Sequence, residues 1–493
     1  MCSSGPHALP TRVIDVGWSD TEVSLVVSSG RNGEWVALSH CWGGSREGLT
    51  TLANFVHRQQ GLYTSELPSL FRDAIHITRK LGFRYLWIDS LCIIQDSRPD
   101  WESECLKMNE YYRNCFLNIS ASFASNSREG IFSSANSRQW ATLLMTVQGH
   151  STTHDINGKI HFRRQSRDIK ESPLNQRAWV LQESLLSPRV LWYDADQLRW
   201  DCITVCIDED IPGPFDKKNY RHKLGRLILR NNVKNEDSAF DILWCWYCYL
   251  NNFVHRRIQF PSDRLPAIAG LAAEVSRRSG FHYKHGLWEE DILGGLRWNA
   301  HGTKIQLDVS TGIPSWSWAS VEGISPKGQR LFCYHHKRIS DSDAHFMGFS
   351  NTGDFHSDIP GQAMPRSISL NGRWQLLKTS NRLPYFETNI DRRSDHPISI
   401  PPKSDQIRIS LDSWPDLEKS FFERLRPDII YFQLGKWDGS LMPLFKEQCE
   451  MIYALVLEPL NTGEDQYRRI GIAEIPKGYT EAQEWPTRTV NIF

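Results

Sequence analysis

The sequence lacks the features that mark several large classes of protein. No window approaches the ~20 consecutive apolar residues of a membrane-spanning helix. The first ten residues contain no basic segment followed by an apolar one, so no secretory signal peptide is predicted. Neither sign of charge is in excess, because 57 Lys and Arg balance 57 Asp and Glu. This balance argues against nucleic-acid binding by the chain as a whole, which depends on a net basic surface.

Signatures of common catalytic and metal sites are also missing. We find no Gly-rich phosphate loop and no Gly-x-Ser-x-Gly turn. The 11 Cys are scattered, unlike the disulfide framework of a small secreted domain, so we expect a cytoplasmic protein with reduced thiols. Cys245 and Cys248 have Cys-x-x-Cys spacing, but no second Cys or His pair lies at a zinc spacing. We therefore expect buried helix cysteines there and no metal site.

The chain's length and composition predict several domains. Its 493 residues exceed one ordinary domain, and 40% hydrophobic residues are enough for a sizeable core. After residue 313, short β-prone runs alternate with Pro, Gly and Asp turns, which is typical of β-rich structure. We expect an N-terminal lead (1–33), an α/β domain (34–210) with a polar insertion at about 124–170, a helical region (211–312) and a β-rich C-terminal region (313–493).

The first part of the α/β domain alternates apolar runs with segments of helical periodicity. Apolar residues over 67–81 recur at i, i+3, i+4 and i+7, the pattern of a helix with one buried face. The continuous apolar run over 85–94 is typical of a strand buried on both faces. Together with strands over 34–39 and 116–121 and a helix over 99–113, this predicts a parallel sheet of order 2-1-3 with flanking helices.

A third helix over 175–187 is expected to cover the same sheet. It would make the α/β domain discontinuous across the 124–170 insertion, which we expect to hold loops and one or two edge strands. We expect Trp179 and Leu186 to be more than nine-tenths buried. Short strands over 189–193 and 197–202 follow this helix.

The segment 217–234 carries seven Lys or Arg and no acidic residue. One interpretation is a solvated helix face, and the other is a surface that contacts an anionic membrane or a partner helix.

Polar and nucleophilic side chains follow each predicted strand. In open parallel sheets, ligands bind beyond the carboxyl ends of the strands. Two of these residues, Asp89 and Asp96, also suit an ordinary structural role, as caps of turns and helix N-termini. The residues at this edge are His40 and Trp42 after the first strand and Asp89, Cys92, Gln95 and Asp96 after the second.

The helix over 175–187 carries a carboxylate among apolar residues. If Glu183 is buried it needs a partner, such as Arg189 or a backbone amide, and it is either a structural pairing residue or a catalytic carboxylate. We expect four side chains to surround one concavity, with Arg177 or Arg189 close enough to pair a carboxylate: Asp89, Cys92, Asp96 and Glu183.

Three ordered blocks of these residues resemble the fungal heterokaryon-incompatibility (HET) domain. Val36 to Gly43 resembles its first block, Leu67 to Asp96 its central block, and Arg177 to Arg189, which includes Trp179 and Gln182, its third block. Downstream, the segments 263–270, 286–288 and 314–319 are similar to a tail common in these proteins.

The resemblance implies a class of function. HET-domain proteins are associated with allorecognition in filamentous ascomycetes, in which fusion of incompatible hyphae triggers programmed cell death. Their core is thought to be similar to the Toll/interleukin-receptor (TIR) domain, some members of which assemble by domain contacts and some of which cleave the nicotinamide–ribose bond of NAD with a Glu. The first hypothesis is a cytoplasmic cell-death effector that acts through self-association or protein partners.

The second hypothesis is an enzyme. It is either an NAD glycohydrolase, with NAD as the substrate, or a tailoring enzyme of a metabolite pathway. Asp89 or Glu183 would stabilise positive charge on a departing glycosyl centre. Cys92 would be a nucleophile only if its pKa were lowered by a helix N-terminus or a cation. Release of nicotinamide from NAD discriminates between the two hypotheses.

Overall fold

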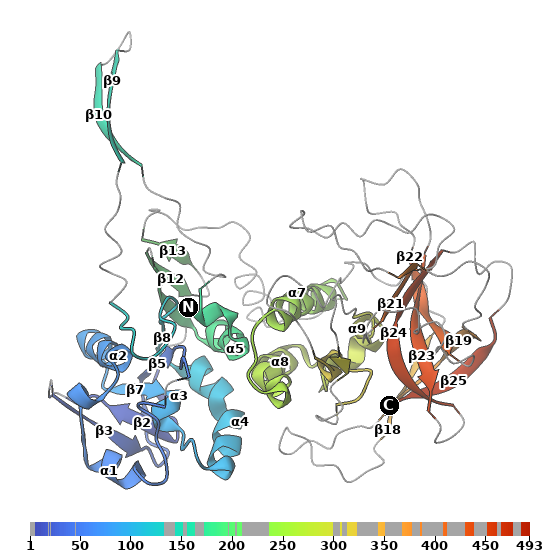
Figure 1. Ribbon diagram of the computed structural model, residues 1–493, viewed down its shortest axis with the longest axis horizontal. Coiled ribbons are helices and arrows are strands. Elements are labelled where there is room, and N and C mark those ends of the chain that lie inside the picture. Colours follow the sequence, from blue (N-terminus) through green and yellow to red (C-terminus); the bar gives the residue numbers. More distant parts are fainter. Residues whose placement is uncertain are drawn as a thin grey trace. The chain divides into compact units, whose positions relative to one another are not determined.

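The chain forms two compact units, Met1–Arg226 and Leu227–Phe493. The computed structural model describes residues 5–17, 19, 21–44, 46–132, 143–150, 155–162, 172–195, 197–202, 205–209, 236–298, 306–307, 313–322, 344–350, 367–376, 385–386, 408–411, 429–437, 451–460, 465–476 and 485–493 (Figure 1).

Within its described residues, unit 1 is built on a nine-stranded mixed sheet. The strand order is β13-β12-β11-β8-β5-β7-β2-β3-β6. The strands are β2 (Arg12–Asp15), β3 (Glu22–Val27), β5 (Trp35–Ser39), β6 (Leu62–Tyr63), β7 (Tyr85–Ile88), β8 (Leu117–Ser120), β11 (Arg189–Tyr193), β12 (Leu198–Cys202) and β13 (Cys206–Asp208). A separate two-stranded sheet pairs β1 (His7–Ala8) with β4 (Asn32–Gly33).

The centre of the sheet confirms the predicted parallel order. β5 pairs in parallel with β7 on one side and with β8 on the other, which is the order 2-1-3. β2 pairs antiparallel with β7 and β3 with β2, so the sheet extends into the segment 1–33 that was expected to be a lead. β11 extends the parallel core on the other side, beside β8.

Two helices connect the parallel strands. They are α2 (Ser69–Lys80) and α4 (Arg98–Asn114), which lie on opposite faces of the sheet (Figure 1). This is the arrangement that right-handed crossovers in opposite directions require. The buried face of α2 includes Leu70, Phe71 and Ala74, as its periodicity predicts. α4 begins where the Ser97 side chain accepts a hydrogen bond from the Asp100 backbone N–H.

The expected strand over 85–94 is wrong in its second half. β7 ends at Ile88, and residues Asp89–Cys92 form a helical turn, α3. One carboxylate oxygen of Asp89 accepts the Ser90 backbone N–H at 2.7 Å, which holds the turn. Leu91 and Cys92 are fully buried in it, and a short buried apolar run does not by itself distinguish a strand from a helical turn.

The third predicted helix is α5 (Ala178–Leu186), which packs against α4. Leu186 is buried as expected, but the expectation for Trp179 is wrong, because its side chain stays partly exposed. The indole is large, and Trp is more often mostly buried than completely buried.

The described part of the 124–170 insertion corrects another expectation. β9 (Leu143–His150) and β10 (Asp155–Phe162) pair with each other in a two-stranded antiparallel sheet, so they are not edge strands of the main sheet. Unit 1 also contains α1 (Phe55–Gln60). The basic segment 217–234 lies outside the described residues.

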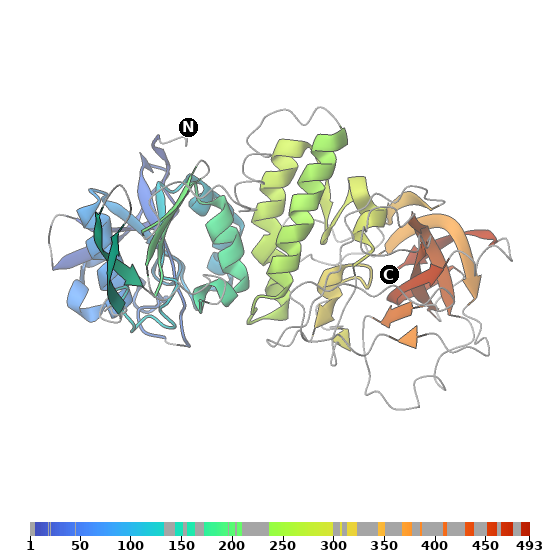
Figure 2. The same ribbon diagram turned by 90° about the horizontal axis from the view of Figure 1, so that it is seen from above.

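The described part of unit 2 has helices first and strands after them. Its helices are α7 (Glu236–Val254), α8 (Pro266–Ser279) and α9 (Ile292–Gly295) (Figure 2). Two short antiparallel pairs accompany them, namely β14 (Tyr283–Lys284) with β15 (Leu287–Trp288) and β16 (Gln306–Leu307) with β17 (Val321–Glu322).

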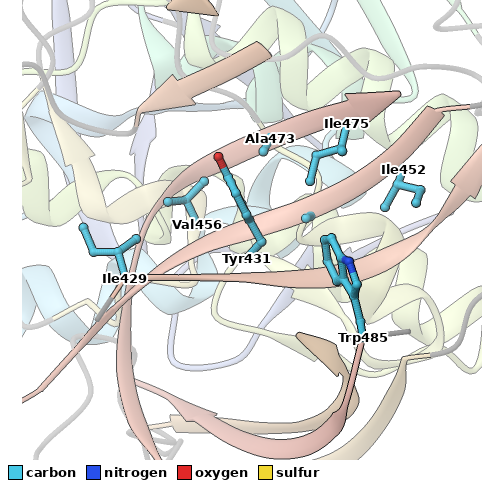
Figure 3. Packing of buried hydrophobic residues seen from close by; sticks show 8 residues of the cluster. Ile429, Tyr431, Ile452, Val456, Ala473, Ile475 and Trp485 are labelled. Atoms are coloured by element: carbon cyan, nitrogen blue, oxygen red, sulfur yellow. The ribbon is translucent and has the colours of Figure 1, made fainter. Parts of the chain in front are cut away.

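The described strands from His345 onward form one eight-stranded sheet. Its order is β18-β19-β22-β23-β24-β21-β20, and β25 pairs with both β19 and β24. Side chains from three central strands gather on one face, where Trp485 packs over them (Figure 3). The strands are β18 (His345–Ser350), β19 (Ser367–Leu376), β20 (Tyr385–Phe386), β21 (Arg408–Leu411), β22 (Ile430–Trp437), β23 (Met451–Pro459), β24 (Gln466–Pro476) and β25 (Thr487–Ile492).

A search of the described helices finds none that is long and apolar enough to cross a membrane.

Candidate functional site

Four buried polar side chains meet at the carboxyl end of β5, and they come from β5, β8, α4 and α5. The Ser39 hydroxyl donates to Glu183 Oε2 at 2.5 Å, and the Asn118 amide donates to Ser39 Oγ at 3.0 Å. The Tyr112 hydroxyl, from α4, donates to the Leu38 backbone carbonyl at 3.4 Å and lies beside the side chains of Ser39 and Glu183. Each of the four is at least nineteen-twentieths buried. We call Ser39, Tyr112, Asn118 and Glu183 the polar cluster.

Burial dominates the electrostatics of Glu183. It raises the pKa of this carboxyl from 4.5 to about 7, while the charge of Arg177 and the hydrogen bond from Ser39 act in the opposite direction. A carboxyl with this pKa is divided between its protonated and ionised forms near neutral pH. Such a group is able to accept or release a proton there, which an exposed Glu does not do.

Arg177 connects α5 to the end of β5. It occupies the N-cap position of α5, and its guanidinium donates to the backbone carbonyl of His40. Its charge also favours the ionised form of Glu183. Of the two arginines expected to pair a carboxylate, Arg177 is therefore the one beside Glu183.

His40 and Asp89 lie next to the polar cluster. His40 Nδ1 is buried 3.6 Å from Asp89 Oδ1, and within the described structure it has no hydrogen-bond partner. Burial lowers the pKa of His40 to about 4, although Asp89 acts to raise it, so the imidazole is neutral at neutral pH. The other oxygen of Asp89 accepts the Trp42 indole N–H at 3.0 Å. Asp89 thus joins the loop after β5 to the end of β7.

Two of the expected site residues, Asp96 and Arg189, make contacts outside the polar cluster. Asp96 accepts the Leu52 backbone N–H at 2.8 Å, which is the turn-capping role left open by the sequence. Arg189 donates to the Phe116 carbonyl and lies 4.5 Å from the centre of the Phe116 ring. Because Phe116 precedes β8 and Asn118 lies within it, Arg189 is at the amino end of the parallel strands.

Cys92 has the position of a structural core residue. It is fully buried, and burial raises the pKa of its thiol to about 12, the opposite of what a nucleophile requires. Gln95 donates to the backbone carbonyls of Asp89 and Ile93, and so holds the turn after β7. Gln182 is buried on α5. In the described part of the chain no group of three or more His, Cys, Asp and Glu could hold a metal ion.

Three members of the polar cluster, Ser39, Tyr112 and Asn118, were not among the predicted site residues. Asn118 lies in the middle of an apolar strand, where an unpaired amide is costly, so its position signals a buried hydrogen-bond partner. Tyr112 gives no such signal, since a Tyr on the apolar side of a helix is ordinary core.

The loop that carries Trp42 depends on a glycine. Gly43 has φ +63°, and a Cβ there would lie 2.1 Å from the Asn126 Cβ atom. Gly44 has a similar φ of +73° but nothing within 4 Å of an added Cβ, so it is a matched control. We expect Gly43→Ala to lower the free energy of unfolding by about 2 kcal/mol and Gly44→Ala by about 1 kcal/mol, as measured by urea denaturation. Equal losses for the two variants would contradict the contact between Gly43 and Asn126.

Comparison with known proteins identifies part of unit 1. Residues 35–183 match the family described as heterokaryon incompatibility protein (HET). The match begins at the first residue of β5 and ends at Glu183, so it includes all four residues of the polar cluster. The search of curated proteins finds no match, and neither does the search of solved structures.

Proposed function

From the heterokaryon-incompatibility domain that this chain contains over residues 35–183, we propose that it is a cytoplasmic effector of fungal non-self recognition. It promotes programmed cell death when incompatible cells fuse. It acts through contacts of the HET domain with a second copy or with a partner protein. A TIR-like core, which the resemblance implies, is part of this proposal.

The observation that carries the proposal is the convergence of distant HET-domain segments on one polar cluster. Ser39 comes from the first block, Glu183 from the third, and the two are joined by a hydrogen bond across 144 residues. Asp89, from the central block, adds its charge to the environment of Glu183. Burying a carboxyl so that its pKa rises to about 7 is unfavourable for stability, and perturbed groups of this kind gather at functional sites.

The same cluster supports a second candidate function, cleavage of NAD to ADP-ribose and nicotinamide with water as the acceptor. The favouring observation is that Glu183, with a pKa of about 7, lies at the carboxyl edge of a parallel sheet, where α/β proteins bind ligands. The purified full-length protein is incubated with NAD and nicotinamide is measured. Nicotinamide release that is lost in the Glu183→Gln variant would support NAD cleavage. Absence of release from the wild type would favour an effector that acts through protein contacts.

We expect Glu183→Gln to abolish cell death on overexpression while the protein stays folded. Glutamine keeps the shape of the side chain and removes its ionisation, and its carbonyl still accepts the Ser39 hydroxyl. Viability after induced expression is measured together with the melting temperature of the purified protein.

Glu104→Gln is the matched control, because Glu104 is equally buried but is paired with Lys107 and Tyr111, away from the polar cluster. It should lower the melting temperature and still cause cell death. A Glu183→Gln protein that kills as efficiently as the wild type would contradict the proposed role of the polar cluster.

A further inference from the structure

A cavity of about 680 Å³ lies along the outer face of α2 in unit 1. Gly82 to Arg84, which precede β7, form part of its lining, so it lies toward the amino end of the parallel strands. The polar cluster lies at the carboxyl end. The cavity is therefore a separate feature, and its function does not depend on the proposal above.

The lining of this cavity is strongly basic. Its formal charges are four cations, Arg72, Arg79, Lys80 and Arg84, and one carboxylate, Asp73; His76 also lines it. The chain as a whole has no net charge, so this concentration of one sign is local. Like charges held together on one surface repel each other and attract an anion.

The cations differ in how firmly they are held. Arg79 donates to the Val16 carbonyl from two nitrogens, at 2.8 and 2.6 Å, and to the Glu22 carbonyl at 2.9 Å, which orients its guanidinium. Arg84 is paired with Asp15, but its side chain stays 57% exposed. Arg79 is thus an oriented cation of the lining, and Arg84 is an exposed one.

The remaining cations are on the exposed stripe of α2. Arg72 and Lys80 are two turns apart on the same face, with His76 between them, and all three are exposed. The hydrogen bonds of Arg72 go to the neutral oxygens of Ser65 and Ser69. Among the described residues, the Lys80 ammonium has no hydrogen bond or ion pair. These two side chains are able to reach an anion without breaking an ion pair of the fold.

We propose that this basic cavity binds a small soluble molecule that carries a chain of phosphate groups, such as a nucleoside triphosphate. Guanidinium groups bind phosphate oxygens with two parallel hydrogen bonds, and several cations on different sides match several phosphates. A volume of about 680 Å³ is that of a small-molecule site. The neutral chain argues against a nucleic-acid surface, which is broad and carries excess positive charge.

The test is calorimetric titration of the full-length protein with inorganic tripolyphosphate and with ATP. We expect both to bind, and the Arg72→Gln/Lys80→Gln double variant to bind each at least tenfold more weakly. The matched control is Arg31→Gln/Arg98→Gln, which removes two exposed cations outside the cavity and should change the dissociation constants less than twofold. Equal binding of the two ligands would mean that phosphates alone are recognised, and tighter binding of ATP would mean that the nucleoside adds contacts; both outcomes support the site.

Other outcomes overturn the proposal. These are no binding of either ligand at millimolar concentration, or equal binding by the wild type and the double variant of the cavity. Binding only to vesicles that contain phosphatidylserine, or only to a short DNA duplex, would also overturn it, because it would replace a small ligand by a macromolecular surface. The double variant's melting temperature should equal that of the wild type, since both substituted side chains are exposed.

Discussion

Arg469→Met is expected to lower the free energy of unfolding by about 3–5 kcal/mol, the largest effect of any single substitution considered for this chain. The Arg469 side chain is completely buried. Its guanidinium donates to the Leu296 carbonyl at 2.6 Å and to the Trp298 carbonyl, and it lies 3.5 Å from the centre of the Trp298 ring. Methionine keeps the volume but leaves two buried carbonyl oxygens without these donors.

The same arginine joins distant parts of unit 2. Its backbone N–H donates to Ser315 Oγ at 3.0 Å, and the Trp298 indole donates to the Trp316 carbonyl at 3.0 Å. β24 is thus connected to the end of the helical region and to the segment 314–319. Loss of Arg469 should therefore destabilise helices and strands of unit 2 together.

The neighbouring Arg468 provides the control. Its side chain is 43% exposed and pairs with Glu458, so Arg468→Met should reduce stability by less than about 1 kcal/mol. Urea denaturation followed by tryptophan fluorescence compares the two variants with the wild type. Equal losses would show that burial of Arg469 contributes nothing beyond a surface ion pair.

Glu183→Gln is expected to change how stability depends on pH. Glu183 has a pKa of about 7 in the folded protein and 4.5 as its ordinary value. Below pH 4.5 the carboxyl is protonated in both states and contributes no difference. As pH rises from 4.5 to 7, the Glu183 carboxyl ionises in the unfolded chain but stays protonated in the folded protein. The free energy of unfolding therefore falls by about 3 kcal/mol.

Glutamine does not ionise and is free of this loss. The stability of Glu183→Gln relative to the wild type should therefore increase by about 3 kcal/mol between pH 4 and pH 8. The charged groups that face Glu183 are Arg177, which opposes the shift, and Asp89, which adds to it. The measurement is urea denaturation of both proteins across this range.

His40→Gln is the control for this pH series, because burial moves the His40 pKa in the other direction. The pKa of His40 falls from 6.5 in the unfolded chain to about 4 in the folded protein. As pH falls from 6.5 toward 4, the imidazole takes up a proton in the unfolded chain but not in the folded protein, so the stability that His40 contributes above pH 6.5 is lost. His40→Gln should gain stability relative to the wild type in acid, and Glu183→Gln should gain it in alkali. Parallel pH profiles for wild type and Glu183→Gln would contradict the burial of an ionisable carboxyl at position 183.

Local periodicity was enough to predict the central elements of the fold. The apolar stripe of α2 and the apolar runs of β5, β7 and β8 depend on neighbours a few residues away, so their type and parallel order could be predicted without coordinates. The three blocks that resemble the HET domain could also be recognised in the sequence, because each is a short continuous run of residues. The same reasoning could not tell where β7 ends, since a helical turn and a strand bury Leu91 and Cys92 equally well.

The sequence by itself thus determined the α/β core, the helical and β-rich segments that follow, and the resemblance to the HET family over residues 35–183. Only the tertiary structure decided which polar groups meet. Glu183 is bonded to Ser39, 144 residues away, whereas Asp96 caps a nearby turn and Arg189 lies at the opposite end of the strands. The basic cavity likewise combines Arg79 with the carbonyls of Val16 and Glu22. The physical reason is that backbone periodicity is set by local burial, while the pKa and partner of a buried side chain are set by whatever distant segment packs against it.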